Sequence, residues 1–307
     1  MSAAWVAGTV RARSLVRRRL GSDGARALLA AGSVPAAVEL LVHSPYGHAV
    51  RPGDDADTAA RGVAATLLWN LRVLAGWLPA AGSELLRVLV GFFEIVNIEE
   101  HLRAVTGRPA APPYVLGSLA TAWPRLAQAG SPDELRAALT ASPWRDPGGS
   151  TPRDIQIGLR LAWAERVRAR VRAAGPWVAG AVALLLAREV VVRGEPVPPA
   201  ARHTVERLLG PAAAQAASFP DLGASLSGPA RWVFDGIDDP AELWRAEVAW
   251  WRRLHTDATA LVTQAGFGPE PVTGAVALLA HDAWLVTAAL AGVGRGSEAL
   301  EWFDALA

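Results

Sequence analysis

The chain has 307 residues and a mass of 32.2 kDa, enough for one large domain or for about three of roughly 100 residues. Hydrophobic residues make up 51% and charged residues 19%, which excludes disorder as its main state. All 30 basic residues are Arg, and the chain has no Cys, so the composition excludes lysine Schiff-base chemistry, a P-loop, thiolate nucleophiles, disulfides and iron–sulfur ligation. The net charge of +1 provides no global field for nucleic acid.

The pattern of the sequence predicts helices throughout. Apolar residues recur every three or four positions, and Gly and Pro fall between long stretches. From the N-terminus onward, Asp54–Asp57, Ser131, Thr151 and Asp239 each stand where a side chain caps the start of a helix. We expect about a dozen helices and no sheet.

An internal repeat indicates how these helices are organised. Residues 28–46 align without a gap with residues 126–144, and both segments end in Ser-Pro-aromatic: Ser44-Pro45-Tyr46 and Ser142-Pro143-Trp144. In each copy a helix ends at Gly, a Ser begins a second helix, and a turn directs the aromatic ring toward the core. A third copy, expected near Gly210, does not align.

The repeat spacing of 98 residues predicts three helical units. Pro- and Gly-rich stretches at 107–113 and 194–199 supply the boundaries. The predicted units are residues 1–110, 111–198 and 199–307.

Candidate catalytic and metal sites have little support in the sequence. His43, His48 and His101 do not have the spacing of metal ligands, and no nucleophile or dinucleotide-binding motif is present. We therefore expect no catalytic residues, no metal and no cofactor. Clustered arginines in residues 11–19 and 166–172 favour a solvated or ion-paired surface, with an acidic protein partner as the alternative.

The segment Val272–Gly294 is long and apolar enough to cross a bilayer, and it carries His281 and Asp282 at its middle. Its flanks lack Arg anchors, and we see no second equally apolar segment. These features favour a core helix, so we expect no transmembrane span. With no export signal visible after Met1, we expect a cytoplasmic protein. The abundance of Ala and the use of Arg in place of Lys are typical of a GC-rich bacterial genome.

Several motifs in residues 1–150 resemble a known family, the central-stalk subunit of rotary V-type and archaeal-type ATPases. This subunit is called C in bacteria and archaea and d in eukaryotes. The opening Trp5-to-Arg13 is similar to the family's aromatic-led first helix, Ser44-Pro45-Tyr46-Gly47 to its small-polar-Tyr turn, and Phe93-to-Arg103 to its Trp-Asp-Val-x-Asn-Ile…Leu-Arg motif. The residues that carry the resemblance or its repeat are Trp5, Arg11, Arg13, Ser44, Pro45, Tyr46, Phe93, Glu94, Asn97, Arg103, Ser142, Pro143 and Trp144. In this chain Phe93 and Glu94 replace the usual Trp and Asp, and the counterpart near Arg188-Glu189 lacks the Asn.

The resemblance implies an all-α, funnel-shaped protein of three similar helical domains with pseudo-threefold symmetry. Such a subunit is non-catalytic and peripheral on the inner face of the plasma membrane. It is a socket that couples the rotor shaft subunits to the membrane proteolipid ring in ion-transport-coupled ATP hydrolysis or synthesis. Within the motif, Asn97 would bond a turn or helix-end backbone group, and Arg103 would pair with an acid such as Glu94 or Glu99. For the motif residues we favour the interpretation that they hold domain cores together and touch no partner.

Two alternatives remain open at this stage. One is a free-standing helical adaptor, and the other is a membrane-embedded proton-path protein centred on Asp282.

Overall fold

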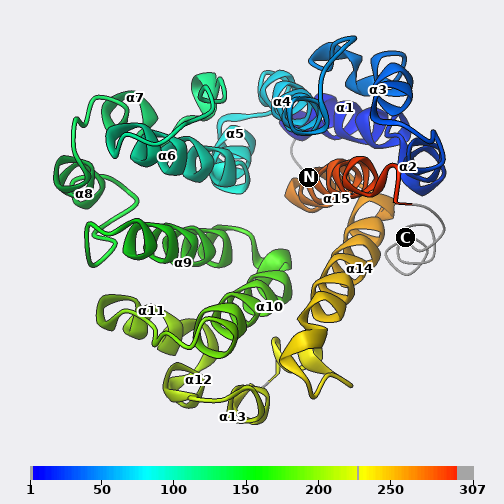
Figure 1. Ribbon diagram of the computed structural model, residues 1–307. Helices are drawn as coiled ribbons and strands as arrows, with labels where there is room; N and C mark the ends of the chain where they lie inside the picture. The colour runs from blue at the N-terminus through cyan, green and yellow to red at the C-terminus, as the bar shows by residue number, and fades with distance from the viewer. Residues whose placement is uncertain (1–2, 227, 296–307) are drawn as a thin grey trace. The chain divides into compact units, whose positions relative to one another are not determined.

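The computed structural model describes residues 3–226 and 228–295, and in these residues it contains helices and turns but no strand, which confirms the all-α prediction (Figure 1). The chain divides into two compact units. Unit 1 comprises residues 1–83 and 251–307, and unit 2 comprises residues 84–250. Both ends of the chain therefore contribute to one unit. The division into residues 1–110, 111–198 and 199–307 stays a prediction.

Unit 1 is built around the long apolar helix α15 (Pro269–Gly292), which packs against α1, α2 and α4. Its other elements are η1 (Ala3–Trp5), α1 (Val6–Arg17), α2 (Gly21–Leu29), α3 (Val34–Val42), η2 (Pro45–His48) and α4 (Ala56–Ala75). Helices α5 (Ala80–Leu89) and α14 (Leu243–Thr263) carry the chain from one unit to the other.

Unit 2 is built around α9 (Pro152–Arg170), which packs against α6, α10 and α11. It begins with α6 (Gly91–Val105), η3 (Gly117–Leu119), α7 (Trp123–Leu126) and α8 (Pro132–Thr140). After α9 come η4 (Arg172–Ala174), α10 (Gly175–Leu186), a π-helical segment η5 (Ala187–Val192), α11 (Pro199–Leu209), α12 (Pro211–Gln215), α13 (Phe219–Ser225), η6 (Arg231–Phe234) and η7 (Pro240–Glu242).

The predicted helix caps are confirmed. The side chains of Asp55, Ser131, Thr151 and Asp239 each accept a hydrogen bond from a backbone N–H at the start of the helical segment that follows. The four acidic and polar residues were therefore correctly interpreted as structural, and the acidic run Asp54–Asp57 caps a helix.

A third pair of serines, Ser218 and Ser225, makes the same local contacts as the serine pairs of the two aligned segments. Ser218 caps α13, as Ser33 caps α3 and Ser131 caps α8. Ser225 Oγ then donates to the Leu222 carbonyl at 2.7 Å, as Ser44 does to Leu41 and Ser142 to Leu139. This segment does not align with the other two because its serines lie seven positions apart, against eleven in each of the others.

Phe93 and Phe92 provide a matched test of the packing in unit 2. Phe93 is 6% exposed and lies edge-on to Tyr114, whereas Phe92 is 46% exposed. We expect Phe93→Ala to lower the free energy of unfolding by about 3–5 kcal/mol because it leaves a cavity. Phe92→Ala should cost no more than about 1 kcal/mol. Denaturant unfolding of both variants measures the difference, and equal losses would contradict the assignment of Phe93 to the core.

Candidate functional site

The two Ser-Pro-aromatic turns share one geometry. In each turn the Ser Oγ accepts from the backbone N–H of the aromatic residue two positions on, at 3.1 Å for both Ser44 and Ser142. Pro45 and Pro143 are exposed, while Tyr46 and Trp144 are 6% and 2% exposed. The serine hydroxyl therefore fixes a turn that directs the ring inward, as the repeat predicts.

Each buried ring donates a hydrogen bond to a buried carboxylate. The Tyr46 hydroxyl donates to Asp282 Oδ2 at 2.7 Å, and the Trp144 Nε1–H donates to Glu94 Oε1 at 2.8 Å. Asp282 lies on α15 and Glu94 on α6, at 2% and 1% exposure. The two contacts join residues 236 and 50 positions apart in the chain.

Each carboxylate also accepts two backbone N–H groups. Asp282 accepts from Leu20 at 3.1 Å and Gly21 at 2.6 Å, where α2 begins. Glu94 accepts from Thr121 at 2.5 Å and Ala122 at 2.7 Å, immediately before α7. We call these two sets of contacts the first clasp (Asp282, Leu20, Gly21, Tyr46) and the second clasp (Glu94, Thr121, Ala122, Trp144).

The clasps supply the hydrogen-bond donors that the two buried carboxylates require. A buried carboxylate is stable only when its lone pairs receive donors, and charge-assisted bonds from amides are among the strongest available. Burial, and then the adjacent charge of Asp282, raise the pKa of Tyr46 well above its ordinary value of 10.0. The phenol therefore stays protonated and remains a donor.

Arg166 adds a cation to the second clasp. Its guanidinium lies 4.8 Å from the ring centroid of Trp144 and donates to Thr121 Oγ1 at 3.2 Å. Burial lowers the pKa of Arg166, although the charge of Glu94 opposes this shift. Arg166 is therefore a partly buried member of the site, which corrects its interpretation as part of a surface cluster.

Asn97, three positions after Glu94, fastens the loop before η3. Its amide nitrogen donates to the Tyr114 carbonyl at 2.9 Å, and its oxygen accepts from the Tyr114 N–H at 2.6 Å. The predicted backbone role of Asn97 is thus confirmed.

Arg103 contacts neither Glu94 nor Glu99, the two acids given as examples of its partner, and the acid beside it is Glu100. Arg103 Nε donates to the Pro109 carbonyl at 3.0 Å and lies 3.9 Å from Glu100. Glu94 is occupied by the second clasp, and Glu99 pairs with Arg160 on α9. The backbone amides before α7 are better donors for a buried acid than an arginine that reaches solvent.

The opening motif residues lie in unit 1. Arg13 donates to the carbonyls of Val262, Gln264 and Gly266 at 3.1, 2.6 and 3.1 Å, beyond and at the end of α14. Trp5 packs toward Gly82, and the Arg11 Nε is buried without a hydrogen-bond partner within the described chain. Neither clasp includes these three residues.

The candidate histidines have structural surroundings. His43 pairs with Glu39 on the surface, His48 stacks on Trp69, and His101 bonds to the Ala129 carbonyl at 2.8 Å. Across the described residues, no group of three or more His, Asp or Glu side chains is placed to hold a metal ion.

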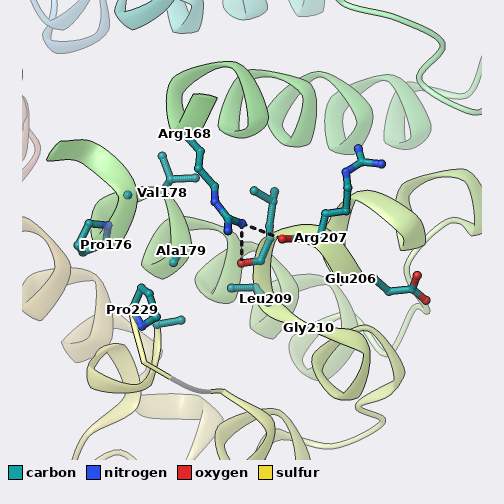
Figure 2. Close-up of a pocket in the computed structure, with 12 residues that line it drawn as sticks. Arg168, Pro176, Val178, Ala179, Glu206, Arg207, Leu209, Gly210 and Pro229 are labelled. Atoms are coloured by element: carbon teal, nitrogen blue, oxygen red, sulfur yellow. Dashed lines mark hydrogen bonds between the residues drawn. The ribbon is translucent and has the colours of Figure 1, made fainter. Parts of the chain in front are cut away.

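A shallow pocket of about 390 Å³ lies in unit 2 between α10 and α11 (Figure 2). Arg168 reaches its wall and donates to the carbonyls of Arg207 and Leu208 at 2.7 and 3.3 Å. That guanidinium therefore closes the end of α11, and we assign no ligand to the pocket.

Two described helices are long and apolar enough to cross a membrane, Pro269–Gly292 and Arg172–Val190. The second is shorter and less apolar than the first, in agreement with the expectation that no second segment is equally apolar. Most of each helix is buried inside the protein, 72% and 61% of the apolar window, as in a core helix.

Sequence reasoning missed the clasps, although it noted both acids. Among the described residues the buried acids are Glu94, Glu189 and Asp282, which are 95 and 93 positions apart. That spacing is close to the repeat length and was the feature of the sequence that could have revealed the clasps.

No protein-family model matches the sequence, and no curated protein matches it significantly.

The first clasp can be tested by a double-mutant cycle on Tyr46 and Asp282. We expect Tyr46→Phe alone to lower the free energy of unfolding by about 1–3 kcal/mol, because Asp282 loses one donor while remaining buried. Asp282→Asn should also destabilise, since its amide group faces the donors. The double variant should lose less than the two single losses combined. Additive losses would show that the hydroxyl and the carboxylate do not interact.

His281 predicts a loss of stability in acid. Burial, followed by the charges of His255 and Arg19, lowers the pKa of His281 from 6.5 to about 3. In the unfolded chain this imidazole takes up a proton below about pH 6.5, so its neutral folded form costs about 2 kcal/mol of stability at pH 5 relative to pH 7. We expect His281→Gln to lack this part of the decline, whereas His43→Gln, at an exposed position, should retain it. Identical pH profiles for wild type and His281→Gln would contradict the prediction.

Proposed function

We propose that the chain is a non-catalytic central-stalk subunit of a bacterial V-type or archaeal-type rotary ATPase. In this role it is a socket between the rotor shaft and the membrane proteolipid ring. The observation that carries the proposal is the internal use of the motif residues. Glu94 and Asn97 bind backbone groups of later segments, and Tyr46 and Trp144 donate to buried carboxylates. A motif of this kind belongs to a scaffold, as a socket requires, and the same residue pattern is what resembles the family.

The proposal includes three similar helical domains arranged as a funnel with pseudo-threefold symmetry. It is supported by three Ser-capped helices, α3, α8 and α13, and by three buried acids at intervals close to the repeat length. It is also supported by the joining of the two ends of the chain in unit 1, where Asp282 of the last described helix binds the start of α2.

The mechanism we propose is mechanical. The socket would pass torque as a rigid body, so its helices must resist sliding under load. Close packing resists compression. The clasps add directional bonds from side chains on one helix to the backbone of another, and large aromatic side chains fill the space between them. The chain would act on the cytoplasmic face of the membrane without a span of its own, with α15 as a core helix.

Partner capture tests this function. A tagged chain is recovered from gently solubilised native membranes after brief cross-linking, and its partners are identified by mass spectrometry. We expect P-loop ATPase subunits together with a small membrane-ring protein. An untagged strain serves as the control for background binding. Recovery of the chain alone, from the soluble fraction, would overturn the rotary role and favour a free-standing helical adaptor.

Asp282 separates the socket from a proton-path protein. Its carboxylate already holds three donors in the core, so in the socket Asp282→Asn changes stability and leaves proton conduction unaffected. Proton flux measured in proteoliposomes reconstituted with the wild-type chain alone should equal that of empty vesicles. Flux that disappears in the Asn variant would contradict the socket.

A further inference from the structure

One arginine in unit 1 has a buried donor that the fold leaves unused. Within the described chain, four side-chain polar atoms are buried and have no hydrogen-bond partner: Thr9 Oγ1, Arg11 Nε, Arg19 Nη1 and Arg166 Nη1. Arg166 has the charge of Glu94 close to it, whereas Arg19 forms no ion pair with any described residue. A buried donor without a partner is unfavourable, so Arg19 calls for an explanation.

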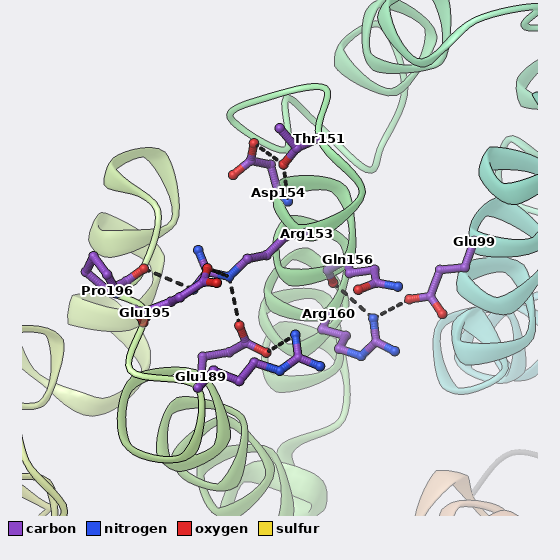
Figure 3. Close-up of polar contacts among 10 residues, drawn as sticks. Glu99, Thr151, Arg153, Asp154, Gln156, Arg160, Glu189, Glu195 and Pro196 are labelled. Atoms are coloured by element: carbon purple, nitrogen blue, oxygen red, sulfur yellow. Dashed lines mark hydrogen bonds and ion pairs between the residues drawn. The ribbon is translucent and has the colours of Figure 1, made fainter. Parts of the chain in front are cut away.

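Other half-buried arginines show which partner such a group takes. Arg153 binds the carboxylate of Glu189 at 2.9 Å, and Arg160 binds that of Glu99 (Figure 3). A guanidinium presents its donors in a planar fork that matches the two oxygens of a carboxylate. The partner that this chemistry predicts for Arg19 is therefore a carboxylate, and the described chain does not supply one.

Arg19 lies beside two histidines of the last two described helices. The residue after it, Leu20, donates its N–H to Asp282 at 3.1 Å, and Asp282 directly follows His281 on α15. His255, on α14, lies edge-on to His281 with ring centroids 4.6 Å apart. Burial first and positive charge second lower the pKa of both imidazoles, and Arg19 contributes to that charge in each case.

These three side chains together offer several donors and one positive charge. Neither imidazole makes a hydrogen bond to a described residue, so each neutral ring keeps one N–H to donate. Asp282 is not their partner, because its oxygens accept from Tyr46 and from two backbone amides. With both rings neutral at pH 7.5, Arg19 carries the charge of the cluster. A single charge matches a carboxylate better than a phosphate, which is mainly a dianion at this pH.

The cluster reaches the surface between two aromatic side chains. Trp251 stacks on Trp284 with centroids 4.8 Å apart, and the two rings lie 5.9 and 5.8 Å from that of His281. His281 is 3% exposed, whereas Arg19, His255 and both tryptophans are half-buried. A ligand can therefore meet the rim of the cluster from solvent and reach the buried imidazole beneath it.

We infer that Arg19, His255 and His281 form a binding site for a carboxylate group. The guanidinium holds the carboxylate through its unused Nη1–H, and each imidazole donates one N–H. Trp251 and Trp284 pack against the apolar part of the bound molecule. Two sources share this chemistry, a small free carboxylic acid and a glutamate side chain of a peptide. The site lies within unit 1 and does not depend on the proposed rotary role.

Ligand-observed NMR on the full chain tests the site and separates the two sources. Saturation-transfer difference spectra are recorded at pH 7.5 with sodium propionate and with the capped peptide Ala-Glu-Ala. Propionamide and capped Ala-Gln-Ala, which have the same shape without the charge, are the matched controls. We expect the carboxylates to bind at least about tenfold more tightly than the amides.

A signal from propionate supports a free acid, and a signal from the Glu peptide alone supports a peptide side chain. Absence of both signals, or equal binding of the neutral amides, would overturn the inference.

Variants locate the bound carboxylate at this cluster. Arg19→Gln should weaken binding at least about tenfold, whereas Arg18→Gln, which removes the same charge from an exposed neighbour, should bind as the wild type does. His255→Phe keeps a ring against His281 and removes its donor, so it should weaken binding about threefold or more. Circular dichroism shows whether each variant folds, and His255→Phe decides if Arg19→Gln does not. Unchanged binding in a folded Arg19→Gln or His255→Phe, or an equal loss in Arg18→Gln, would contradict the site.

Discussion

The fold depends on two carboxylates that are buried and must be given donors. A carboxylate removed from water is destabilising unless hydrogen bonds replace its hydration. Asp282 and Glu94 each receive two backbone amides and one ring hydrogen. Because the amides belong to short helices distant in the sequence, each acid brings together elements that local helix formation would leave apart. The first clasp thus joins the last described helix to the beginning of the chain.

The clasps extend local turn chemistry into tertiary structure. A serine hydroxyl fixes the turn, the turn directs an aromatic ring inward, and the polar hydrogen of that ring meets the acid. The Tyr–Asp and Trp–Glu pairs make the same hydrogen bond from a ring group to a buried carboxylate, with side chains of different lengths. The third buried acid, Glu189, has arginines as its partners.

Local features could be read from the sequence, whereas long-range partners could not. The helices, the caps at Ser131 and Thr151, and the inward rings of the Ser-Pro-aromatic turns depend on neighbouring residues, and these predictions are confirmed. Glu94 was named as one example of an acid that could pair with Arg103, whereas its donors are backbone amides 27 and 28 positions away, which local sequence patterns do not identify. Asp282 led to a membrane hypothesis because an acid within an apolar helix is compatible with a membrane span and with a protein core. Only its contacts in the structure identify the donors that stabilise it in the core.

The same contacts define what a resemblance in these motifs can support. Tyr46, Asn97 and Trp144 use their polar atoms inside the protein, so their presence in a sequence indicates how its helices are held together. Recognition of a partner depends on side chains that remain at the surface, such as Val10 at 55% and Trp77 at 53% exposure. A chain can retain every clasp residue while its surface changes, and it would then keep the scaffold and lose the partner. The clasps explain how helices are held together within each unit, and the identity of the partner must come from the surface that meets it.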